Sequence, residues 1–169
     1  MSKKLYIMVG IPGSGKSTWL EEHKKYFAET YAIISRDQIR FNLVKENEPY
    51  FSRENEVFAQ YIDLIKKSLE NNQETYADAT HLNSASRGKL LRALRSSLKD
   101  NDVEINVIYI KKNVEDAIKQ NENRKDTRGY VPESAIRRMN SQLEKPELSE
   151  GFTKIITVMN KNTKTVERV

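Results

Sequence analysis

The 169-residue sequence contains no cysteine and only two histidines. The absence of cysteine excludes disulfide bonds, thiolate metal sites and a cysteine nucleophile. The histidines, His23 and His81, are far apart in the sequence, a spacing that does not indicate a metal site. The composition therefore gives no sign of a metal centre built from thiolates or imidazoles.

Long apolar runs are also missing from the sequence. None approaches the roughly 20 residues that a helix needs to span a membrane. The apolar run at the N-terminus is too short for a signal peptide, and it leads directly into a glycine-rich loop. We therefore expect a cytoplasmic protein with no membrane partner.

Charge of both signs is plentiful, with a small positive excess. Lys and Arg number 29 against 24 Asp and Glu, which gives a net charge of +5. Such a surface attracts acidic ligands such as nucleotides or nucleic acid, although a solvated basic face without a partner explains the excess as well. A length of 169 residues is close to the ~150 typical of one domain, so we expect residues 1–169 to form a single domain.

Short apolar runs alternate with segments of helical periodicity. The runs that predict buried strands are Leu5–Val9, Tyr31–Ile34, Val103–Ile110, Ile155–Met159 and, more weakly, Thr75–Asp78. Helical spacing marks Val57–Leu69, Ser84–Leu98 and the segment after Pro132. This alternation predicts an α/β fold, a parallel β-sheet flanked by helices on both faces, with ligands at the carboxyl ends of the strands.

The strongest motif follows the first predicted strand. The segment G-I-P-G-S-G-K-S-T matches the P-loop pattern, in which backbone N–H groups cradle phosphates at the start of a helix. Lys16 would supply a positive charge to the β- and γ-phosphates, and the Ser17 hydroxyl would bind Mg²⁺. The residues predicted to bind ATP here are Gly10, Gly13, Ser14, Gly15, Lys16, Ser17 and Thr18.

The second strand runs into S-R-D-Q-I-R, which places Asp37 where an acceptor hydroxyl should lie. A carboxylate there suits the general base of a kinase. Arg40, one helical turn further on, would bind an anionic group of the acceptor, and Arg36 is a weaker candidate for that task. Alternatively, Asp37 simply caps the helix that starts near Gln38.

Two further segments follow strands. Asp78 ends the third strand and would hold Mg²⁺ through water, unless it is a turn or N-cap residue. Arg124 and Arg128 flank a polar stretch, residues 121–132, that is placed to form a lid over the phosphates. A solvated basic loop is the alternative for this stretch.

Together these residues resemble the 5′-polynucleotide kinases among the small P-loop kinases, over almost the whole chain. The segments that carry the resemblance are G-I-P-G-S-G-K-S-T-W, S-R-D-Q-I-R, D-A-T-H, N-E-N-R, V-P-E-S and Q-L-E-K-P-E-L-S-E-G-F. His81 departs from the family pattern, which usually has Asn there. The chain also lacks the D-x-D-G-T motif of the 3′-phosphatase domain that many relatives carry.

The resemblance implies ATP- and Mg²⁺-dependent transfer of the γ-phosphate to the 5′-hydroxyl end of DNA or RNA. It implies that Asp37 is the general base, that Arg40 and Thr80 position the acceptor phosphate, and that Arg124, with Arg128, contacts ATP. A nucleic-acid ligase would be a functional partner. The residues leave two alternatives open: a kinase for a small molecule or modified nucleoside, and a nucleotide-dependent binding module with little turnover.

Overall fold

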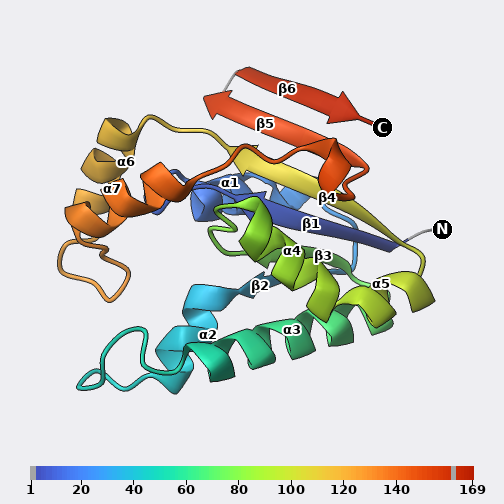
Figure 1. Cartoon of the computed structure of the whole chain (residues 1–169), viewed down its shortest axis with the longest axis horizontal. Coiled ribbons are helices and arrows are strands. Elements are labelled where there is room, and N and C mark those ends of the chain that lie inside the picture. Colours follow the sequence, from blue (N-terminus) through green and yellow to red (C-terminus); the bar gives the residue numbers. More distant parts are fainter. Residues whose placement is uncertain (1–2, 161–162) are drawn as a thin grey trace.

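A computed structural model describes residues 3–160 and 163–169. Within these residues six strands form one sheet in the order β2-β3-β1-β4-β5-β6 (Figure 1). The strands are β1 (Lys3–Val9), β2 (Tyr31–Ser35), β3 (Glu74–Asp78), β4 (Val103–Ile110), β5 (Lys154–Asn160) and β6 (Thr163–Arg168). Strands β1 to β5 are parallel, and β6 pairs antiparallel with β5 at the edge.

Helices cover both faces of the sheet, which confirms the predicted fold class. One face carries α2 (Arg36–Leu43), α3 (Glu54–Glu70), α4 (Ser84–Ala93) and α5 (Arg95–Asp100). The opposite face carries α1 (Lys16–His23) and a short 3₁₀ turn, Lys24–Tyr26. Helices α6 (Val114–Glu122) and α7 (Glu133–Gln142) pack beside the P-loop, and a second 3₁₀ turn, Leu148–Glu150, precedes β5.

The central strand β1 shows why both faces need cover. Successive side chains of a strand point to opposite faces. Leu5 and Ile7 are fully buried against α3 and α4, whereas Met8 is fully buried on the α1 side. Apolar residues at adjacent positions therefore produce a near-continuous apolar run, as expected for a strand inside a parallel sheet.

The predicted helix Ser84–Leu98 is wrong in one respect, because the structure divides it into α4 and α5. The division falls at Leu94, whose φ of −93° and ψ of −2° depart from regular helix geometry. Leu94 is fully buried. The bend lets both short helices keep their apolar side chains on the same core.

The carboxyl ends of the parallel strands lie at one edge of the sheet, as right-handed crossovers require. The loop between α2 and α3 and the loop between α6 and α7 both project beyond this edge (Figure 1). In the part of the chain that the structure describes, no helix is both long and apolar enough to cross a bilayer.

Candidate active site

A cavity of about 690 Å³ opens at the carboxyl edge of the sheet. It is bounded by the P-loop, by the start of α2, by the end of β3 and by the loop before α7. The predicted site residues that line it are Gly13, Gly15, Lys16, Ser17, Arg36, Asp37, Arg40, Asp78, Thr80, Arg124 and Arg128. The structure thus gathers predicted residues from four distant segments around one space. Gly10, Ser14 and Thr18 belong to the same loop and helix but lie outside the cavity lining.

The P-loop backbone requires glycine at Gly13, which has a φ of +80°. A Cβ atom at this position would also lie 2.2 Å from the carbonyl oxygen of Ala117 in α6. The P-loop and α6 are therefore in such close contact that no side chain fits between them. Because α6 leads into the loop before α7, this contact ties that loop to the phosphate cradle.

Lys16 is held by the backbone of its own loop. Its Nζ donates hydrogen bonds to the carbonyl oxygens of Gly10, at 2.8 Å, and Ile11, at 3.0 Å. Burial lowers the pKa of Lys16 to about 8, although Asp78 and Asp37 oppose that change. Lys16 is thus a poorly solvated cation with two exchangeable neutral partners, which is a suitable state for receiving a phosphate.

Ser17 and Asp78 face one another beside Lys16, with 3.4 Å between Ser17 Oγ and Asp78 Oδ2. Burial raises the pKa of Asp78, and Lys16 acts against that rise. Mg²⁺ in phosphotransferases is bound by one or two protein oxygens together with substrate phosphates and water. A hydroxyl and a carboxylate fit that pattern, whereas no cluster of three or more His, Cys, Asp or Glu occurs in residues 3–160 and 163–169.

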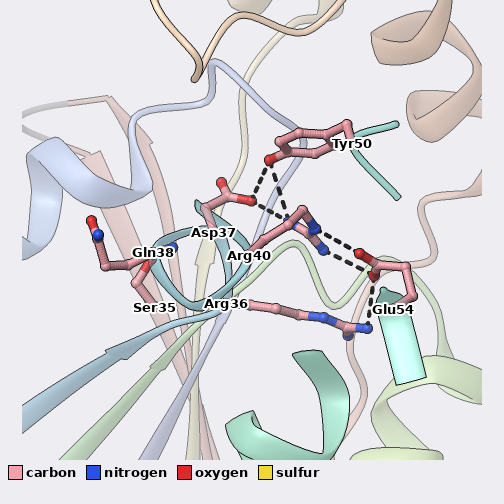
Figure 2. Close-up of polar contacts among 7 residues, drawn as sticks. All are labelled: Ser35, Arg36, Asp37, Gln38, Arg40, Tyr50 and Glu54. Atoms are coloured by element: carbon pink, nitrogen blue, oxygen red, sulfur yellow. Dashed lines mark hydrogen bonds and ion pairs between the residues drawn. The ribbon is translucent and has the colours of Figure 1, made fainter. Parts of the chain in front are cut away.

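Asp37 lies in the first turn of α2, but it does not cap that helix. Ser35 is the N-cap, because its Oγ accepts a hydrogen bond from the Gln38 N–H at 3.2 Å. The Asp37 side chain is 64% exposed and accepts hydrogen bonds from Arg40 Nη1, at 2.6 Å, and from the Tyr50 hydroxyl, at 3.0 Å (Figure 2). The carboxylate is therefore accessible in the cavity and fixed in direction by two donors.

Arg40 is the centre of this network (Figure 2). It is 6% exposed, and its Nε and Nη2 donate to the two carboxylate oxygens of Glu54 at 2.6 and 3.0 Å. Burial by itself would lower the pKa of Arg40, but the hydrogen bonds to Glu54 raise it above its ordinary value. With Nη1 directed to Asp37, each of the three nitrogens of Arg40 has a partner. A guanidinium has five N–H donors, and those of Arg40 make four bonds, because Nη1 also donates to the Tyr50 hydroxyl at 3.3 Å. One N–H of Nη2 is left for an acceptor phosphate.

Arg36 is less fully engaged. It donates one hydrogen bond from Nη2 to Glu54, at 3.3 Å, and lies over the ring of Phe58. Its Nε is buried and has no hydrogen-bond partner among the described residues. Figure 2 shows Arg36 and Arg40 approaching the same Glu54 carboxylate from α2.

The predicted lid lies over the cavity, with Arg124 and Arg128 in its lining. Arg128 reaches α2, donating to the carbonyl oxygens of Phe41 at 3.0 Å and Val44 at 2.7 Å. Cations at a helix carboxyl end are favoured by the helix dipole. Arg128 thus joins the loop of residues 121–132 to the carboxyl end of α2, whereas Arg124 is close enough to Lys16 for its charge to lower the pKa of that lysine.

Thr80 and His81 follow β3. Thr80 lines the cavity, and its carbonyl oxygen accepts a hydrogen bond from the Gly10 N–H at 3.1 Å. His81 is buried with a φ of +44° and bonds to the carbonyl oxygen of Met8 through Nδ1. Because a carbonyl only accepts, Nδ1 carries the proton and Nε2 accepts from the Tyr61 hydroxyl. His81 therefore supports the sheet from within the core.

The late E-G-F segment has a structural role as well. Glu150 makes a two-point ion pair with Arg87, at 2.8 and 3.2 Å, and Arg87 is fully buried. Arg87 also donates to the carbonyl oxygen of His81. Gly151 has a φ of +110°, and Phe152 is 1% exposed in the main core. The segment anchors the chain before β5 to α4 and to the loop after β3.

Tyr50, Glu54 and Asn121 make polar contacts in or next to the site that were not predicted from the sequence. Tyr50 and Glu54 lie in or after the long loop that follows α2, and they approach Arg40 only through the fold. Asn121, within the N-E-N-R segment, is 1% exposed and holds the backbone of Val131. Tyr50 and Glu54 are partly exposed polar residues without a motif around them, so no signal marked their contacts in advance. Asn121 stood within a segment of the resemblance, but its bonds to Val131 depend on the fold.

The profile of a family described as an AAA domain matches residues 5–146. The chain belongs to this family. Together with the P-loop site, this membership makes the protein a nucleotide-binding domain of the P-loop kinase type. A search of curated protein sequences returned no match.

Solved structures share the fold at low identity. A chain of the Pnkp1/Rnl/Hen1 RNA repair complex is 24% identical with a TM-score of 0.66, over 84% of this chain and 44% of that chain. Chaetomium thermophilum Kti12, solved with ADP-AlF3, is 19% identical with a TM-score of 0.66, over 94% of this chain and 90% of that one. A Sinorhizobium meliloti 1021 gluconokinase is 17% identical with a TM-score of 0.55, over 94% of this chain and 83% of that one. Similarity at these identities reports the fold, not the substrate.

Proposed function

We propose that this protein transfers the γ-phosphate of ATP to the 5′-hydroxyl end of a polynucleotide, DNA or RNA. The observation that carries the proposal is the position of Asp37, in the same cavity as the P-loop and Lys16. A nucleotide-binding module has no need of a second carboxylate on the acceptor side. The resemblance to polynucleotide kinases and the neighbour from an RNA repair complex support the choice of acceptor.

In the proposed reaction, a 5′-hydroxyl lies between Asp37 and the terminal phosphate of ATP. Asp37 accepts the hydroxyl proton as the oxygen attacks the γ-phosphorus. The new P–O bond forms while the bond between the γ-phosphorus and the β–γ bridging oxygen breaks, and ADP leaves with that oxygen. Tyr50 and Arg40 hold the accepting carboxylate in place through their hydrogen bonds.

Charge develops on the phosphate oxygens during this transfer, and the cations of the cavity stabilise it. Lys16 contacts the β- and γ-phosphates, and Arg124 approaches them from the lid. Ser17 and, through water, Asp78 would hold Mg²⁺, which supplies further neutralisation of the phosphates when bound. The lid excludes water from the cavity, so transfer to the acceptor is favoured over hydrolysis.

The direct test is a screen of acceptors with labelled ATP. We expect 5′-hydroxyl oligonucleotides to be labelled and 5′-phosphorylated ones to remain unlabelled. Asp37→Asn should retain ATP binding and lose about 10²–10⁴-fold in kcat, the usual contribution of a general base. If no oligonucleotide is labelled, the polynucleotide acceptor is refuted. If the wild type and Asp37→Asn hydrolyse ATP slowly and at equal rates, the protein is a binding module.

A second candidate, a kinase for a small molecule or modified nucleoside, is favoured by the state of Arg40. Four of its five N–H donors already contact Glu54, Asp37 and Tyr50, so a single N–H of Nη2 remains for an acceptor phosphate. The Sinorhizobium meliloti gluconokinase shares the fold. Including common metabolites in the acceptor screen separates the two candidates, because a small-molecule kinase would label one of them and no oligonucleotide. A nucleic-acid ligase as functional partner is part of the first proposal alone.

A further inference from the structure

A smaller cavity of about 230 Å³ adjoins the one described above. The two share Arg36 and Thr80 in their linings, so these residues form the wall between them. The rest of the smaller cavity comes from α3, from the loop between β3 and α4, from α4 itself and from the end of α7. Its other lining residues are Phe58, Tyr61, His81, Leu82, Asn83, Ser86, Leu90 and Gln142.

The charge available in this cavity comes from Arg36. Its guanidinium makes a single, long hydrogen bond to Glu54, whereas Arg40 fills both oxygens of that carboxylate at shorter distances. The buried Nε of Arg36 has no partner in residues 3–160 and 163–169. A buried donor without a partner costs free energy. Because Nε itself is covered, a ligand in the cavity would meet the terminal nitrogens of Arg36, whose side chain is 27% exposed. No carboxylate lines the smaller cavity to compete for the cation.

The size and lining favour a phosphate group as the occupant. A volume of about 230 Å³ corresponds to roughly eight water molecules at ~30 Å³ each, which is enough for a phosphodiester but less than a drug-sized ligand needs. Arg36 offers charged donors, and Thr80 and Gln142 offer a hydroxyl and an amide. The guanidinium lies over Phe58, which keeps it from turning away from the cavity.

The spacing of the two arginines relates this cavity to the acceptor strand. Nη2 of Arg36 and Nη2 of Arg40 contact the same oxygen of Glu54, at 3.3 and 3.0 Å, so they lie side by side. Arg40 lines the larger cavity beside Asp37, whereas Arg36 lines both cavities. A strand that enters with its 5′-hydroxyl at Asp37 would pass Arg40 first and Arg36 next.

We propose that the smaller cavity is a subsite for the second phosphate of a polynucleotide acceptor, with Arg36 as its binding cation. This inference rests on the proposed function, and it makes acceptor length a determinant of affinity. A nucleoside 3′-phosphate would place its one phosphate beside Arg40 in the larger cavity and would leave the smaller cavity empty. An acceptor with a second phosphate would gain the additional charged contact and bind about tenfold more tightly.

The experiment measures KM for a 5′-hydroxyl nucleoside 3′-phosphate and for a dinucleotide and a trinucleotide that also carry a 3′-phosphate. We expect KM to be about tenfold lower for the dinucleotide than for the nucleoside 3′-phosphate, and nearly the same for the trinucleotide as for the dinucleotide. Arg36→Gln should abolish this difference. Gln142→Glu, at an exposed position of the cavity wall, should also reduce it by repelling the phosphate without burying a new charge. Arg36→Lys keeps the charge and should lose part of the gain.

The matched control is Lys67→Gln, which removes the same charge from an exposed site in α3 outside both cavities. It should leave the length dependence intact. Binding of a labelled 5′-hydroxyl trinucleotide without ATP gives a second readout, and Arg36→Gln should reduce its salt dependence by about 0.7 in log Kd per log salt. Equal KM for all three acceptors would overturn the subsite yet leave the proposed function standing, whereas no transfer to any of them would refute the proposed function itself.

Discussion

The side chain of Asn121 forms a pair of hydrogen bonds with the backbone of Val131. Its Nδ2 donates to the Val131 carbonyl at 2.6 Å, and its Oδ1 accepts from the Val131 N–H at 3.1 Å. These two bonds close the base of the loop that is predicted to be a lid, because Asn121 lies in the last turn of α6 and Val131 precedes α7. A short loop fixed at both ends holds Arg124 over the P-loop with little entropy left to lose on ligand binding.

We therefore expect Asn121→Ala to loosen the lid. The variant leaves two backbone groups of Val131 without their partner. KM for ATP should rise and kcat should fall, so that kcat/KM decreases by roughly tenfold. Steady-state kinetics at varied ATP measure this effect. Asn123→Ala, an exposed amide two residues away, is the control and should behave like the wild type. Unchanged kinetics in both variants would show that the pair of bonds does not serve the lid.

Tyr50 should act as a positioning residue for Asp37. Its hydroxyl donates to Asp37 Oδ1 at 3.0 Å and accepts from Arg40 Nη1 at 3.3 Å. Tyr50→Phe keeps the ring and removes both contacts, so Asp37 would be held by Arg40 alone. We expect kcat to fall several-fold, within the range of one lost hydrogen bond, and KM for ATP to stay unchanged. Tyr130→Phe, on the lid and outside the cavity lining, is the control.

The buried His81 should make stability depend on pH. Burial lowers the pKa of His81 to about 4 from 6.5, and the cations Arg36, Lys16 and Arg87 act in the same direction. The unfolded chain therefore binds more protons between these values, so the free energy of unfolding falls as pH decreases below about 6.5. Between about pH 7 and about pH 5, the titration of His81 alone should lower the free energy of unfolding by about 2 kcal/mol.

Urea unfolding at both pH values checks this dependence in the wild type and in His81→Asn. Asparagine does not titrate, and it tolerates the positive φ at this position better than most residues do. The variant should lose most of the pH-dependent decrease. If the free energy of unfolding decreases equally in the wild type and in His81→Asn, the pH dependence comes from other titratable groups.

The buried ion pair between Arg87 and Glu150 should be costly to break. Glu150→Gln leaves the fully buried guanidinium of Arg87 without its countercharge, which we expect to cost ~3–5 kcal/mol of stability. Thermal unfolding followed by circular dichroism measures the loss. The double variant Arg87→Met/Glu150→Leu should recover much of it, because no isolated charge remains. Glu115→Gln breaks an exposed pair with Arg137 and should leave Tm nearly unchanged.

The order of strands and helices could be predicted because it depends on local patterns. Apolar runs gave β1, β2, β4 and β5 to within one or two residues, and the weaker run before Asp78 corresponds to β3. Strand β6 was missed. Its sequence, T-K-T-V-E-R, has little apolar content, and it becomes a strand through its hydrogen bonds to β5 at the sheet edge.

The sequence alone determined the phosphate cradle, because its chemistry is contained in nine consecutive residues. Glycine at positive φ, a lysine and a hydroxyl at the start of a helix function through local backbone geometry. The tertiary structure decided how the arginines are used. In the sequence Arg36 is only a weaker candidate than Arg40, but in the fold a glutamate 14 residues beyond Arg40 accepts two hydrogen bonds from Arg40 and a single, longer one from Arg36. Electrostatic pairing depends on distance in space, and only the fold sets that distance.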